Sequence, residues 1–138
     1  MEPETTTDPR PPALGVARVL MAGLALFSAW VFLASLIALG DAGIDGIVDV
    51  IVSVIWVAIA AGVIHNGTRM RMLAWAGLAF QLCCFVIVSA CGEAAWARQC
   101  RVWYDAGAAY WWLPAFFVLV TSLWMIISDP RRLAGRSA

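Results

Sequence analysis

Residues 72–92 read MLAWAGLAFQLCCFVIVSACG and contain no charged side chain. A helix needs about 20 consecutive apolar residues to cross about 30 Å of hydrocarbon, and this stretch has that length. Backbone polar groups inside lipid must be satisfied within the segment itself, so the run is expected to form a transmembrane helix. The same test, applied outward along the chain, predicts the rest of the fold.

Three further stretches pass this test. The predicted spans cover residues 19–40, 47–64, 72–91 and 109–128. Hydrophobic residues make up 63% of the 138 residues and charged residues 13%, which leaves too little polar surface for a soluble protein of this size. The sequence therefore predicts an all-α integral membrane protein, with a bundle of four transmembrane helices within residues 14–128.

The arginines indicate how this bundle is oriented. Seven of the nine fall on one side of the four-span arrangement, and only Arg98 and Arg101 fall on the other. Because short cytoplasmic loops carry the excess of positive charge, both termini are expected in the cytoplasm. Residues 1–13, rich in Pro, Thr and acid, then form a disordered cytoplasmic tail, and residues 129–138 form a basic one.

The use of Arg without any Lys hints at a GC-rich bacterial genome, so the expected location is the inner (plasma) membrane. An uncleaved or cleaved signal segment is an alternative for the first span, because Ala38 and Gly40 form a small-residue pair before Asp41. Its apolar run is longer than a usual signal core, and three more spans follow it.

The predicted bundle interior is poor in reactive groups. Asp49, at the outer edge of the second span, is its nearest approach to an ionisable side chain, whereas pumps and proton-coupled transporters need such groups within the membrane. The spacing of the four Cys and the single His fits no metal site and no haem ligand pair. We expect no enzyme activity, no cofactor, no metal and, lacking a basic patch, no nucleic acid.

Gln81 lies near the middle of the third span, where an unpaired amide is costly. The expected partners are hydroxyls on other spans: Ser28, Ser35, Ser53, Thr121 or Ser122. Such a contact usually joins helices, and a substrate contact is the alternative. For Asp49, capping of the second helix with pairing to Arg98 or Arg101 is favoured over a cation site.

Small residues predict where the helices approach one another. They are Ala22, Ala25 and Ala29 on the first span, Ala58 and Gly62 on the second, and Ala74 and Gly77 on the third. Pro114 is expected either to open the last helix or to kink it.

The outer loop between the third and fourth spans is the most distinctive segment. Its aromatic residues are Trp96, Trp103, Tyr104, Tyr110, Trp111 and Trp112. Trp96, Cys100 and Trp103 recur at the spacing of one helix face, which predicts a short amphipathic helix lying in the outer interface. The loop is either an aromatic belt or a docking surface for a lipid or a protein.

Cys91 and Cys100 are candidates for a disulfide in this loop. A continuous helix would separate their Cα atoms by about 13 Å, whereas a disulfide tolerates about 7 Å. The loop is therefore either bridged or a continuous helix from Cys91, and both interpretations stay open.

Together these features favour a small accessory or structural subunit that docks onto a larger membrane or cell-envelope complex. Its docking surface would be the fourth span and the Trp-rich outer loop, with membrane lipids as further partners. The alternative is a homo-oligomeric transporter or flippase for a neutral or lipid-linked molecule, with Gln81, Asp49 and the tryptophans as contacts. Thiol chemistry in the outer loop is the least favoured, because no CxxC is present.

Overall fold

The computed structural model describes residues 15–129, and every regular element in that range is helical. The α-helices are α1 (Gly15–Ala42), α2 (Ile47–His65), α3 (Thr68–Ala90), α4 (Ala95–Gln99) and α5 (Leu113–Ile127). Two 3₁₀ segments, η1 (Gly43–Gly46) and η2 (Tyr104–Tyr110), join α1 to α2 and α4 to α5. The predicted N-terminal tail, residues 1–13, lies outside the described residues. So does the predicted C-terminal tail, residues 129–138, except for residue 129.

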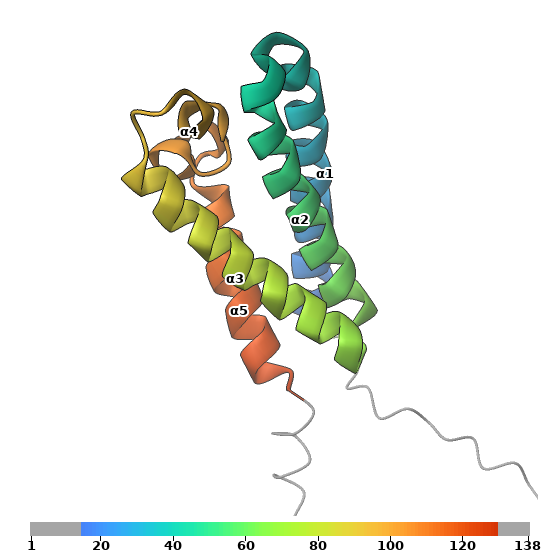
Figure 1. Cartoon of the computed structure of the whole chain (residues 1–138). Coiled ribbons are helices and arrows are strands. Elements are labelled where there is room, and N and C mark those ends of the chain that lie inside the picture. The colour runs from blue at the N-terminus through green and yellow to red at the C-terminus, as the bar shows by residue number, and fades with distance from the viewer. Residues whose placement is uncertain (1–14, 130–138) are drawn as a thin grey trace, which may run out of the picture.

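Helices α1 and α2 form an antiparallel hairpin that turns through η1 (Figure 1). The ring of Phe27 on α1 meets the ring of Trp56 on α2 edge to face, with centroids 5.2 Å apart. The Ser28 hydroxyl donates to the backbone carbonyl of Trp56 at 3.1 Å. Large apolar side chains and one hydroxyl therefore hold this pair of helices together.

Helices α2 and α3 approach closely through the small residues that the sequence singled out. A Cβ atom on Gly62 would lie 2.7 Å from the Met70 carbonyl oxygen, and one on Gly77 would lie 2.5 Å from Cγ1 of Ile59. The prediction is confirmed for these two helices. It is wrong for the first helix, where Ala22 and Ala29 are exposed and bulky residues pack inward instead.

Helix α5 is joined to the rest of the fold at both ends. At its beginning Pro114 occupies the first turn, so this proline opens the helix without kinking it. At its end the guanidinium of Arg71, on α3, donates to the Ser128 hydroxyl and to the Asn66 side-chain oxygen, both at 3.0 Å. Arg71 therefore links the α2–α3 turn to the end of α5, which the sequence did not predict.

The outward faces of the helices are apolar, as expected for a protein in lipid. Leu26, Ile37, Val86 and Leu119, on three different helices, are each more than 60% exposed. These long apolar helices indicate a membrane-embedded protein.

By length and hydropathy, the described residues hold two stretches able to cross a membrane, Gly15–His65 and Thr68–Ala90. The bent pair Ala95–Tyr110 and Leu113–Ile127, with 98° between its parts, makes a third if it counts as one span. The first stretch contains both α1 and α2, which fold back on each other (Figure 1). The all-helical fold is confirmed, and four spans remain a prediction.

The close approach of α2 and α3 can be tested at Gly62. Because a methyl group there would press on a backbone carbonyl, we expect Gly62→Ala to lower the free energy of unfolding by about 1–3 kcal/mol. Thermal unfolding in detergent micelles measures the effect. Gly40→Ala is the matched control, since a Cβ at Gly40 meets nothing within 4 Å. Equal stability of the two variants would contradict the packing described above.

Candidate functional site

The outer loop folds inward and contains a short helix, α4, but the predicted helix face of Trp96, Cys100 and Trp103 does not form, because this helix ends first. Helix α4 has only five residues and ends at Gln99, and the chain turns at Cys100. Cys100, Val102 and Trp103 are then buried, with at most 2% exposed surface. These three side chains are therefore removed from water by packing against the helices of the same chain.

Trp103 of the loop makes a hydrogen bond deep in the helical bundle. Its indole Nε1 donates to the side-chain oxygen of Gln81 at 2.7 Å, and the Gln81 amide nitrogen donates to the Val52 carbonyl at 2.9 Å. None of the hydroxyl partners expected for Gln81 is used. The amide is satisfied by the loop and by the backbone of α2, at a depth where an unmade hydrogen bond would be costly.

A second polar contact ties the loop to the outer end of the α1–α2 hairpin. The Asp49 carboxylate accepts from the Ser35 hydroxyl at 2.8 Å and from the backbone N–H of Val102 at 3.4 Å. Asp49 is 2% exposed and lies in the first turn of α2, where the helix dipole favours a negative charge. Arg101 adds electrostatic attraction, whereas the hydrogen bonds come from Ser35 and the backbone.

Aromatic rings pack around Trp103 and Tyr110. The ring of Trp103 lies 6.3 Å from that of Trp56 and 5.5 Å from that of Phe85. The ring centroids of Phe27 and Tyr110 lie 6.4 Å apart, and Tyr110 is 2% exposed. Trp103 and Tyr110 therefore anchor the two ends of η2 in one aromatic core, where such ring pairs add stability beyond their buried area.

The remaining aromatic residues of the loop are less buried than Trp103 and Tyr110. Tyr104 is 38% exposed, Trp111 78% and Trp112 60%, while Trp96 is half-buried. Trp111 and Trp112 both have left-handed backbone angles, with φ of 53° and 57°. Such angles cost roughly 1–2 kcal/mol for a residue with a Cβ, so the surrounding structure has to enforce them. The predicted docking residues are thus divided into an inner set and an outer pair.

The structure does not join Cys91 and Cys100. Both are free thiols: Cys91 is exposed and Cys100 is buried. Burial raises the pKa of the Cys100 thiol to about 12, with a smaller contribution from the negative charge of Asp49. Cys100 therefore stays protonated and unreactive at neutral pH, because the thiolate is the nucleophile.

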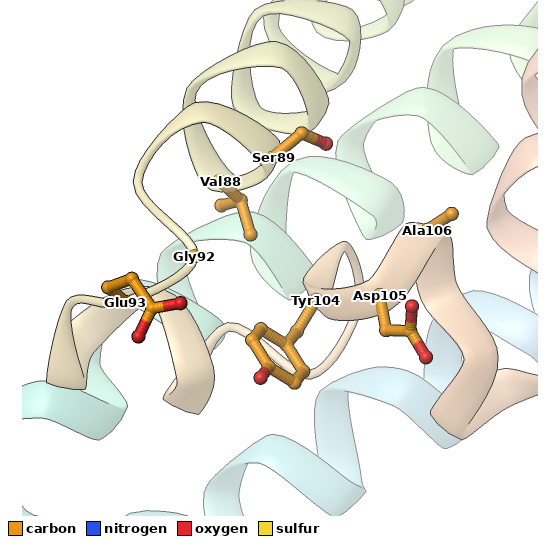
Figure 2. Close-up of a pocket in the computed structure, with 7 residues that line it drawn as sticks. All are labelled: Val88, Ser89, Gly92, Glu93, Tyr104, Asp105 and Ala106. Atoms are coloured by element: carbon orange, nitrogen blue, oxygen red, sulfur yellow. The ribbon is translucent and has the colours of Figure 1, made fainter.

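An open pocket of about 560 Å³, which no sequence pattern predicts, lies at the C-terminal end of α3. Figure 2 shows Glu93 at the left, Tyr104 and Asp105 in the centre and to the right, and Val88 of α3 above them. The two carboxylates give it negative charge. Across residues 15–129, no set of three or more His, Cys, Asp or Glu side chains is arranged to hold a metal ion.

No family model, curated protein or solved structure matches the chain. The function is therefore inferred from the contacts of the described residues and from the surfaces that they leave open.

The hydrogen bond between Gln81 and Trp103 can be tested through the cysteines of the loop. In the wild-type protein a maleimide should modify exposed Cys91 and leave buried Cys100 intact. We expect Gln81→Leu to loosen the loop, because the buried indole N–H loses its acceptor, and to raise the labelling rate of Cys100 relative to Cys91 about tenfold. Peptide mass mapping after timed labelling measures both sites.

Phe80→Leu, at the neighbouring position of α3 with 40% exposure, is the matched control and should leave Cys100 protected. Full protection of Cys100 in Gln81→Leu would contradict the role given to this hydrogen bond.

Proposed function

We propose that the chain is an accessory subunit of a larger complex in a bacterial inner (plasma) membrane. It crosses the bilayer four times, with both termini in the cytoplasm, and docks through α5 and the adjacent Trp111–Trp112 pair. The observation that carries the proposal is this pair of exposed tryptophans, held on left-handed backbone at the outer end of an apolar helix face.

The outward face of α5 supplies the rest of the docking surface. Phe116, Leu119, Leu123 and Ile127 recur at helical spacing and are 54%, 71%, 57% and 59% exposed. Helix α5 has 15 residues, or about 22 Å at about 1.5 Å per residue, which is shorter than the hydrocarbon core. A helix this short and this sparsely packed suits a partner helix that lies along it.

The conformation of the tryptophans favours protein docking over simple anchoring. An aromatic belt needs only rings at the depth of the headgroups, which ordinary backbone angles provide. Strained backbone persists where the structure over-determines it, and such sites are often functional. Tryptophan is also enriched among the residues that contribute most to protein interfaces.

The interior contacts make transport the weaker alternative. Asp49 and Gln81 were the candidate substrate contacts, and both are engaged within the chain, with Ser35, Val102, Val52 and Trp103 as partners. A substrate would have to displace the loop before it could reach them.

The proposed orientation in the membrane rests on the arginines, seven of which lie on the predicted cytoplasmic side.

The proposal predicts the loss of partners in a double variant. Tagged wild-type protein, purified from native membranes in a mild detergent, should bring down a defined set of membrane proteins. In Trp111→Ala/Trp112→Ala their yield should fall at least about tenfold, because each buried tryptophan anchor typically contributes about 2 kcal/mol or more. Quantitative mass spectrometry measures the yield.

Trp75→Ala/Phe80→Ala removes two aromatic rings of α3 that are 40% exposed, and it is the matched control that should keep the partners. Recovery of the wild-type chain alone, or equal losses in both double variants, would contradict docking through α5 and the outer pair.

A further inference from the structure

A cleft of about 430 Å³ lies between α1 and α5. Its lining consists of Gly23, Leu26, Phe27 and Trp30 of α1 and Leu113 and Phe117 of α5. None of these six residues carries a charge. Leu26 and Trp30 are 73% and 46% exposed, so the mouth of the cleft lies on the outside of the helices. Its volume is within the range of small-molecule sites.

Within residues 15–129, three buried polar atoms have no hydrogen-bond partner. They are Nε1 of Trp56, the hydroxyl of Tyr110 and Oγ1 of Thr121, in residues with at most 2% exposed surface. Buried polar atoms in native proteins are nearly always paired, and each unpaired one costs about 1–3 kcal/mol. A bound molecule with matching polar groups would satisfy them.

The lining side chains stand between the cleft and these atoms. The ring centroid of Phe27 lies 5.2 Å from that of Trp56 and 6.4 Å from that of Tyr110. The ring centroids of Tyr110 and Trp30 are 5.1 Å apart. Phe27 stacks on Phe117 with ring centroids 4.8 Å apart.

Thr121 follows Phe117 by one turn of α5, so it lies on the same face of the helix. A threonine in a helix can bond back to the carbonyl of the preceding turn, but the Thr121 hydroxyl makes no such bond. The three polar atoms thus belong to residues in contact with the cleft lining or one turn beyond it.

We propose that the cleft between α1 and α5 binds a neutral lipid with a single apolar tail and an uncharged, hydroxyl-bearing head. The tail lies along Leu26, Trp30 and Leu113. The head reaches the Tyr110 hydroxyl and the Trp56 indole N–H once the Phe27 ring turns aside. The indole only donates, so the head must offer an oxygen acceptor. A charged head is disfavoured, because moving an ion from water through this apolar lining is costly.

Native mass spectrometry of the protein, released from detergent with added 1-monoolein, tests the proposal. We expect one monoolein per chain, and no adduct with 1-octadecene, which has a comparable tail and no oxygen. Gly23→Leu should abolish the adduct by filling the cleft, since a Cβ at Gly23 has only ordinary contacts with Phe117 at 3.7 Å and the variant should fold. Gly40→Leu, in open space on the same helix, should bind normally.

The head contact has its own pair of variants. Tyr110→Phe keeps the ring and removes the hydroxyl, so the apparent Kd for monoolein should rise about five- to tenfold. Tyr104→Phe, on the exposed tyrosine of the same segment, should bind like the wild type. Binding of monoolein that survives in Gly23→Leu, or that is equal in Tyr110→Phe and the wild type, would overturn the proposal.

Discussion

The hydrogen bond from the Trp103 indole to Gln81 is the contact on which the outer half of the molecule depends. A glutamine in the middle of an apolar helix needs a partner, and an indole buried among helices needs an acceptor. The Gln81 oxygen accepts the hydrogen bond that the Trp103 indole donates, so each group satisfies the other. This bond holds the loop against the helices. While Trp103 is buried, Trp111 and Trp112 of the same loop are exposed, directly before the start of α5.

The all-helical, apolar fold could be predicted from the sequence because it follows from strong, local signals. Charge-free runs such as residues 72–92 permit little besides a helix in lipid. Glycines such as Gly62 and Gly77 mark a close approach between helices, because side chains there would block it. The hydrogen bond between Arg71 and Ser128 at the end of α5 could not be predicted, because the two residues are 57 positions apart and no sequence periodicity connects them.

The outer loop was predicted less well for a physical reason. Trp96, Cys100 and Trp103 have the spacing of a helix face, but that spacing does not tell a helix lying on lipid from a turn buried in protein. The choice depends on Gln81, whose partners are an indole of the loop and a backbone carbonyl and not the hydroxyls that residue types on the other spans suggest. Asp49 was placed correctly in the first turn of α2, while its bond to the Val102 backbone could not be read from residue types.

The most direct test of this account is hydrogen exchange of the tryptophan indole N–H groups, followed by NMR on ¹⁵N-tryptophan-labelled protein in lipid nanodiscs. Substitution of single tryptophans assigns the signals. The indole N–H of Trp103 should exchange slowly, over hours, because it is buried and bonded to Gln81, whereas those of Trp111 and Trp112 should exchange within the dead time of the experiment. Exchange of Trp103 as fast as that of Trp112 would show that the loop does not enter the bundle, and would contradict the account.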